Sequence, residues 1–217
     1  MVDSASFFNS SNYHITNGNK FNLLHTTDNT LHWKGYIGNY ATYSVLPIQF
    51  KSGLDSTSLQ WGNQENYHAF YQDQLCVIDT TRNNCITWSG RIGDHPNYAK
   101  LPDSYKQGVD ATAFLNGDNY DIFKGGRVCR LNPNKGYTRT GEWPIKDCST
   151  YANLPTDPGY EFDRGIDAAC CLDWANYHLF RDDKLVVINI RQNNKVVHKG
   201  PISEYPTYRA LDWNVTS

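Results

Sequence analysis

Val109-Asp110-Ala111-Thr112-Ala113-Phe114 is one of four related stretches that recur along the 217-residue chain at a spacing of about 55 residues. The other three begin at Val2, Leu54 and Ile166, and each stretch is followed by a polar loop and an Asn-Tyr pair. The four pairs are Asn12-Tyr13, Asn66-Tyr67, Asn119-Tyr120 and Asn176-Tyr177. A unit this small cannot bury its own apolar face, so the four copies are expected to pack together as one domain.

Each repeat is predicted to contain four short strands separated by turns. The third copy has its strands at 109–115, 120–123, 127–131 and 137–141. Paired Asn residues such as Asn193-Asn194 lie between β-branched runs, and Asn tolerates the positive φ of a hairpin turn. Four such units in a row predict an all-β fold, a four-bladed β-propeller. The blades are expected at 2–53, 54–108, 109–165 and 166–217.

Composition and charge exclude two classes of partner. Charged residues make up 19% of the chain, the net charge is −2, and no Lys/Arg cluster occurs, so nucleic acid is not expected to bind. No apolar run is long enough to span a bilayer, so membrane insertion is not expected.

The first residues lack the basic and apolar regions of a signal peptide, which favours the cytoplasm or release without such a peptide. If a signal peptide has already been removed, the protein is secreted.

The repeats resemble the hemopexin-type repeat. The likeness is clearest in 110–114, in Tyr120-Asp121-Ile122-Phe123-Lys124-Gly125 and in Gly200-Pro201-Ile202, and it extends from Val2 to about Leu211. The resemblance implies a four-bladed propeller whose first strands line a central tunnel. In this family the tunnel often holds an ion on main-chain oxygens, so a calcium or sodium ion is expected there, although no cofactor is required. Small residues fit the crowded axis at Ser4, Ser56, Ala111 and Ala168.

The cysteines depart from the pattern of extracellular family members, which commonly join the first and last blades by a disulfide. Blade one contains no Cys, so closure is expected to rest on side-chain packing between blades one and four. In this respect the chain is more similar to the single-domain legume seed albumins of the fold. The six cysteines are expected to be free thiols, with a Cys129–Cys148 bridge left open. No Cys-x-x-Cys occurs, so a structural zinc site is not expected.

One aspartate stands near the start of each repeat, and the four would form a ring at a tunnel mouth. They are Asp3, Asp55, Asp110 and Asp167. One interpretation is a cation, metal or polyamine site, because clustered carboxylates concentrate positive charge. The favoured alternative is that each carboxylate accepts main-chain N–H groups at a strand start. An ion in the tunnel would then be held by main-chain oxygens, as the resemblance implies.

The loops between the first and second strands of blades two and four combine an aromatic ring with amide and carboxylate groups. The candidate ligand-binding residues are Trp61, Asn66 and His68 in blade two and Trp174, Asn176 and His178 in blade four. A sugar stacks its C–H face on an aromatic ring and bonds its hydroxyls to planar polar groups, so this composition favours carbohydrate. The tryptophans could equally pack between blades.

The histidines of the repeat favour an architectural interpretation. His14, His68 and His178 follow the repeated Tyr, one step out of phase with the core positions, so they face the next blade; Asp121 takes this place in blade three. The other four histidines share no repeated position and are given no role. They are His25, His32, His95 and His198.

The chain contains no Gly-x-Ser-x-Gly, no His-Glu-x-x-His and no Gly-rich phosphate loop, and the pattern brings no set of catalytic groups together, so an enzyme is not expected. It is predicted to be a non-enzymatic ligand-binding protein of lectin type, with carbohydrate sites repeated on the blades to gain avidity. The alternatives are a seed-albumin-like protein that binds a polyamine or haem at the tunnel, and a protein-docking module. Glycans or other small ligands are the expected partners, and a homodimer is left open.

Overall fold

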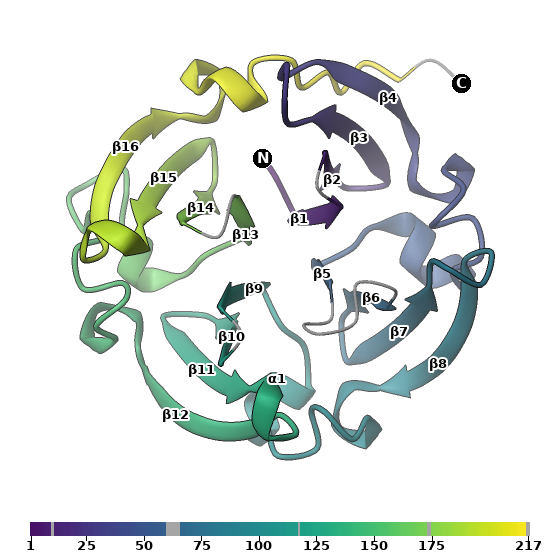
Figure 1. The fold of residues 1–217 in the computed structure, drawn as a ribbon, viewed down its shortest axis with the longest axis horizontal. Helices are drawn as coiled ribbons and strands as arrows, with labels where there is room; N and C mark the ends of the chain where they lie inside the picture. Colours follow the sequence, from purple (N-terminus) through teal and green to yellow (C-terminus); the bar gives the residue numbers. More distant parts are fainter. Residues whose placement is uncertain (10, 60–65, 117, 173–174, 216–217) are drawn as a thin grey trace.

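The computed structural model describes residues 1–9, 11–59, 66–116, 118–172 and 175–215. These residues form four antiparallel sheets of four strands, each sheet built from consecutive strands. The sheets are arranged around a central axis like the blades of a propeller (Figure 1). The prediction of an all-β, four-bladed propeller is therefore confirmed.

The first strand of each blade lies nearest the axis and the fourth lies at the rim (Figure 1). The first strands are β1 (Ser4–Asn9), β5 (Ser56–Leu59), β9 (Ala111–Asn116) and β13 (Ala168–Leu172). The second are β2 (Asn12–Asn17), β6 (Asn66–Tyr71), β10 (Asn119–Lys124) and β14 (Asn176–Arg181). The third are β3 (Lys20–His25), β7 (Gln74–Asp79), β11 (Arg127–Asn132) and β15 (Lys184–Asn189). The fourth are β4 (Leu31–Tyr36), β8 (Cys85–Arg91), β12 (Thr138–Pro144) and β16 (Lys195–Pro201).

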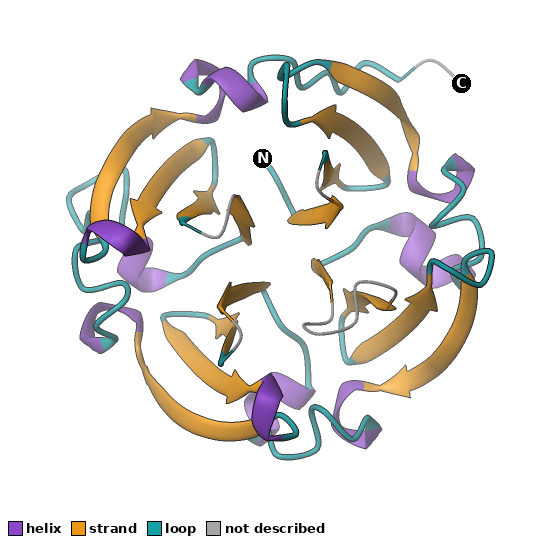
Figure 2. Cartoon of the chain, viewed as in Figure 1, coloured by secondary structure: helices purple, strands orange, loops and turns teal. Residues whose placement is uncertain are grey.

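Short helical turns lie mostly at the perimeter, where the blades connect (Figure 2). They are the α-helix α1 (Asp103–Lys106) and 3-10 helices at Ile37–Asn39, Ile48–Ser52, Ile92–Asp94, Pro133–Lys135, Ile145–Asp147, Phe162–Arg164, Ile190–Gln192, Ile202–Glu204 and Pro206–Tyr208. Within the part of the chain that the structure describes, no helix is both long and apolar enough to cross a membrane.

Burial along the strands follows their place in the blade. The middle four residues of β2, β6, β10 and β14 are all buried, because these strands are covered on both sheet faces. In the rim strand β16, exposed residues instead alternate with half-buried or buried ones, as expected of a strand with one face in solvent. The residues expected at the crowded axis are buried in all four blades.

The hydrophobic core is divided into four clusters, and each cluster joins two neighbouring blades. One combines Phe21 and Tyr43 of blade one with Tyr67 and Ala69 of blade two. Another combines Ala111 and other residues of blade three with residues of blade four. A blade therefore buries its apolar faces only against its neighbours, which is the arrangement that the repeat length predicts.

Blades one and four are joined by packing and by hydrogen bonds. Tyr13 and Ile15 pack against Phe180 and Val187 in one cluster, as expected. The structure adds a contact that the sequence did not suggest, because the segment after β16 passes beside blade one (Figure 1).

A buried amide makes this second contact. Asn22 Nδ2 donates to the carbonyl of Asp212 at 3.1 Å, and the Asp212 N–H donates to Asn22 Oδ1 at 3.0 Å. Lys20 Nζ also donates to the carbonyl of Trp213 at 2.7 Å. Asn22 occupies the register position that Cys76, Cys129 and Val186 hold in the other blades. Blade one therefore replaces a small hydrophobe with an amide that binds the C-terminal segment.

All six cysteines are free thiols, so Cys129 and Cys148 are not bridged. Burial raises the pKa of the Cys76 thiol to about 11 and that of Cys129 to about 12. Such thiols are protonated at neutral pH and act as small hydrophobes.

Candidate functional site

Four carboxylates from four blades face one cavity at a mouth of the tunnel. Asp3, Asp55, Asp110 and Asp167 line a pocket of about 450 Å³, together with residues that include Lys124. Each aspartate immediately precedes the inner strand of its blade. The ring expected from the repeat therefore exists as a shared pocket.

Each carboxylate is anchored by the turn between the second and third strands of its own blade. Oδ2 of Asp110 accepts the N–H of Gly125 at 2.6 Å, and Oδ2 of Asp167 accepts the N–H of Asp182 at 2.6 Å. The same bond joins Asp3 to Gly18 and Asp55 to Gln72. All four donor residues have positive φ, between 53° and 54°, so the turn aims its N–H at the carboxylate. The interpretation that these aspartates satisfy main-chain N–H groups is confirmed.

The anchoring does not use the whole carboxylate. Oδ1 of Asp110 accepts a hydrogen bond from Lys124 Nζ at 2.9 Å inside the pocket. Partial burial raises the pKa of Asp55 and of Asp167, and repulsion from neighbouring carboxylates adds to this rise. The mouth is thus a partly desolvated site of negative charge in which one ammonium group already lies.

Both histidines predicted to bind ligand lie between blades. His68 and His178 are 1% and 0% exposed, and their Nδ1 atoms hydrogen-bond the hydroxyls of Tyr98 and Tyr208 at 2.5 and 2.6 Å. Burial lowers the pKa of each to about 3, so both rings are neutral at pH 7. This placement gives the histidines an architectural position and does not support a part in a sugar site.

The histidine of blade one follows the same plan, whereas blade three departs from it. His14 bonds Tyr43 at 2.7 Å. In blade three Asp121 accepts the Tyr151 hydroxyl at 2.8 Å and two bonds from Arg130 at 2.6 and 2.7 Å. The sequence shows two repeated positions, the residue after Asn-Tyr and the tyrosine of the closing loop. It does not show that the two are hydrogen-bond partners.

The predicted sugar loops are placed only in part. Trp61 and Trp174 lie outside the described residues. Asn66 and Asn176 are half-buried at the first positions of β6 and β14, and Asn176 Oδ1 accepts a bond from Asn189 at 2.9 Å. The structure therefore brings the four aspartates together, while the Trp-Asn pairs stay a prediction.

A further cluster was not expected from the sequence. His25, Asp28 and His32 offer ligand atoms that all lie within 4.8 Å of one another. A signal was present, because the spacing His-x2-Asp-x3-His spans the turn between the third and fourth strands of blade one. Residues on either side of such a turn face each other.

Comparison with known proteins supports the fold. The chain is similar to the hemopexin fold protein CP4 from cow pea, with 19% identity over 96% of both chains and a TM-score of 0.78. It is also similar to a plant albumin from Cicer arietinum showing hemagglutination, with 18% identity over 99% of both chains and a TM-score of 0.76.

A plant lectin with two metal binding sites, also from Cicer arietinum, is 18% identical over 94% of this chain and 95% of that one, with a TM-score of 0.75. No family model matches the sequence, and no curated protein matches it either. The chain thus has the single-domain, four-bladed hemopexin fold of the legume seed albumins.

Proposed function

We propose that this is a non-enzymatic ligand-binding protein that takes up a linear polyamine at the four-aspartate mouth of the tunnel. The observation that carries the proposal is the position of Lys124. Its ammonium group lies 2.9 Å from Asp110 Oδ1 within the pocket, so the mouth already holds one primary ammonium on an alkyl chain. A polyamine would present further groups of the same chemistry to the remaining carboxylates.

The charge of the mouth supports this ligand class. Asp3, Asp55 and Asp167 face the pocket besides the paired Asp110. The raised pKa of Asp55 and of Asp167 indicates that their charges are incompletely compensated, because burial and mutual repulsion disfavour ionisation. Bound ammonium groups would relieve that repulsion, and their attraction to the carboxylates would become stronger as water is excluded.

The separation of the carboxylates favours a polyamine over a single metal ion held by the side chains, because among the described residues no three of the four offer oxygens that lie within 4.8 Å of one another. The four carboxylates come from four blades, and each is anchored by its own turn. A calcium ion would need their oxygens at about 2.3–2.6 Å, whereas a polyamine distributes its charges along a flexible chain. A calcium or sodium ion on main-chain oxygens deeper in the tunnel remains compatible with this proposal.

Titration calorimetry with spermine tests the proposal. We expect one bound spermine per chain, with an affinity that falls as salt is raised. The double variant Asp55→Asn/Asp167→Asn should bind at least about tenfold more weakly, equivalent to about 1.4 kcal/mol. Lys124→Met should bind more tightly than the parent, because it releases Asp110 to the ligand.

The control variant is Asp147→Asn, which removes one negative charge from an exposed position outside the lining of the pocket. It should leave spermine affinity unchanged. Equal binding by the double variant, or weaker binding by Lys124→Met, would contradict the proposal. Displacement of spermine by millimolar calcium would instead point to a metal site at the same mouth.

Carbohydrate binding is a second candidate. Two proteins of this fold are described as a lectin and as an albumin showing hemagglutination. The Trp-Asn loops of blades two and four have the composition of a sugar site. Hemagglutination that is inhibited by a free sugar, and lost in Trp61→Ala/Trp174→Ala, would support it. Haem has less support, because the histidines of the repeat are buried and bonded to tyrosines.

A further inference from the structure

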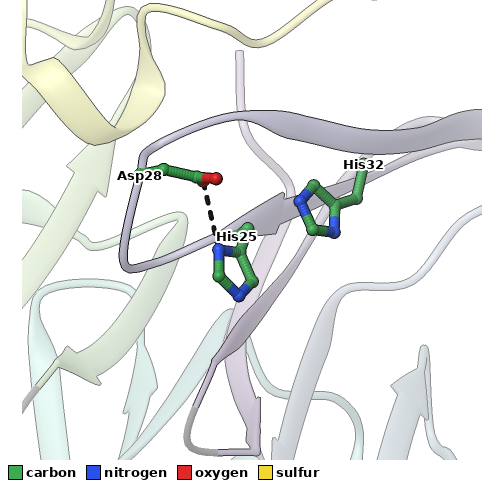
Figure 3. A group of neighbouring side chains, drawn as sticks. All are labelled: His25, Asp28 and His32. Atoms are coloured by element: carbon green, nitrogen blue, oxygen red, sulfur yellow. Dashed lines mark hydrogen bonds and ion pairs between the residues drawn. The ribbon is translucent and has the colours of Figure 1, made fainter.

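Blade one has a cluster of three metal-ligating side chains on the hairpin that joins β3 to β4 (Figure 3). His25 is the last residue of β3, His32 is the second residue of β4, and Asp28 lies in the turn between them. One ligand atom from each residue lies within 4.8 Å of the other two. Asp28 and His32 are exposed and His25 is half-buried, so an ion can reach them from solvent.

The turn fixes the carboxylate in this position. Asp28 Oδ1 accepts the N–H of Thr30 at 3.1 Å, the Thr30 hydroxyl at 2.7 Å, and His25 Nδ1 at 3.1 Å. The His25 N–H closes the hairpin on the Thr30 carbonyl at 2.9 Å, and Asn29 supplies the positive φ of 56° that the turn requires. These bonds hold the Asp28 carboxylate in place beside His25.

The two imidazoles lie face to face. The rings of His25 and His32 stack with centroids 4.6 Å apart and planes inclined by 3°. In a tetrahedral site with metal–nitrogen bonds of 2.0–2.1 Å, the ligand atoms would be about 3.3 Å apart. The present separations are larger by about 1.5 Å at most, a change within reach of side-chain rotation at exposed residues.

We propose that His25, Asp28 and His32 bind one divalent transition-metal ion, for which zinc is the probe. Two imidazoles and one carboxylate are the donors that Zn²⁺, Ni²⁺ and Cu²⁺ prefer, whereas Ca²⁺ prefers oxygen alone. Three protein ligands leave at least one position for water or an external ligand. The site is separate from the tunnel mouth and does not depend on the function proposed there.

The test is calorimetric titration of the metal-free protein with zinc chloride, followed by the absorption spectrum of its cobalt complex. We expect one tight ion per chain in the parent. His32→Gln and Asp28→Asn should each weaken zinc binding at least about tenfold, the size of effect that loss of even an outer-shell partner produces. His32 is exposed, so circular dichroism should show that His32→Gln folds like the parent.

Two controls separate this site from other metal-binding groups. His95→Gln removes an imidazole outside the cluster and should leave zinc affinity unchanged. Cys85 and Cys171 are half-buried thiols that can bind zinc, so the cobalt spectrum should lack a sulfur-to-metal charge-transfer band.

The proposal is overturned if His32→Gln binds zinc like the parent, or if the cobalt spectrum shows thiolate ligands. It is also overturned if only Asp55→Asn/Asp167→Asn abolishes zinc binding, since the ion would then lie at the mouth. Spermine binding by His32→Gln should remain intact, so failure of one proposal is distinguishable from failure of the other.

Discussion

The residue after each Asn-Tyr pair hydrogen-bonds the buried tyrosine hydroxyl of the closing loop of its own blade. Two kinds of side chain make this bond. In blades one, two and four it is a neutral histidine, whose cross-strand neighbour on the third strand is Leu23, Val77 or Val187. In blade three it is Asp121, and its cross-strand neighbour is Arg130. A buried carboxylate needs a counter-charge and a neutral ring does not, so the two positions change together.

Breaking this pair should destabilise the protein strongly. The side chains of Asp121 and Arg130 are 0% and 15% exposed. Asp121→Asn would leave the guanidinium buried without its partner, and we expect a loss of about 3–5 kcal/mol in the free energy of unfolding. Urea denaturation at pH 7.5 measures this loss.

The matched control gives blade three the residue pair found in blade four. Asp121→His/Arg130→Val copies His178 and Val187, and it should recover most of the stability that Asp121→Asn loses. If the double variant is no more stable than Asp121→Asn, a neutral histidine cannot replace the ion pair in blade three. The argument that the two positions change together only to balance a buried charge would then be wrong.

At the scale of the element, the rim strands carry a repeated contact between tryptophan and glycine. Half-buried Trp33, Trp88 and Trp143 lie over Gly35, Gly90 and Gly141, two residues away on the same strand. A Cβ atom on Gly35 would stand 2.4 Å from the Trp33 ring. Trp33 and Trp88 also contact Tyr40 and His95, so their column serves packing between blades.

Gly35→Ala should therefore destabilise the protein, although Gly-to-Ala changes without steric conflict are usually mildly stabilising. Displacement of the Trp33 ring predicts a loss of about 1–3 kcal/mol. Gly200→Ala is the control in blade four, where the nearest atom to the new Cβ is 3.4 Å away. It should change stability by less than about 0.5 kcal/mol. Equal losses in the two variants by thermal denaturation would contradict the steric argument.

The elements that the sequence predicts well are those that each repeat encodes locally. Strand order, turns and the aspartate ring follow from the spacing of the repeat and from where the aspartates stand in it. The bond from His68 to Tyr98 does not, because the two residues are 30 positions apart and meet only when the closing loop folds back. The His25–Asp28–His32 cluster was missed because it belongs to one blade and is not repeated.

At the scale of the whole molecule, the three buried histidines make stability depend on pH. Burial lowers the pKa of His14, His68 and His178 to about 3, against 6.5 when exposed. The unfolded chain therefore binds more protons as pH falls below 6.5. The stability that the neutral rings contribute is complete above pH 6.5 and decreases as pH falls toward 3.

Between pH 7.5 and pH 5.5 each buried histidine should lower the free energy of unfolding by about 1.4 kcal/mol, or about 4 kcal/mol for the three. Urea denaturation in the presence of EDTA measures the difference. His178→Gln should reduce the pH-dependent loss by about one third. The raised pKa of Asp55 and of Asp167 acts in the opposite direction, because the folded protein takes up these protons more readily than the unfolded chain. An unchanged pH dependence in His178→Gln would show that the ring is protonated in the native state.

The amide of Asn22 has a consequence for biosynthesis. Its partner Asp212 lies 190 residues further along the chain. A ribosome adding about 5–20 residues per second therefore exposes the first blade for at least about ten seconds before that partner exists. Throughout that interval the Asn22 amide of the nascent protein is bound by water and lies beside an uncovered apolar surface. A chaperone that binds an incomplete propeller would find its target at this surface of the first blade.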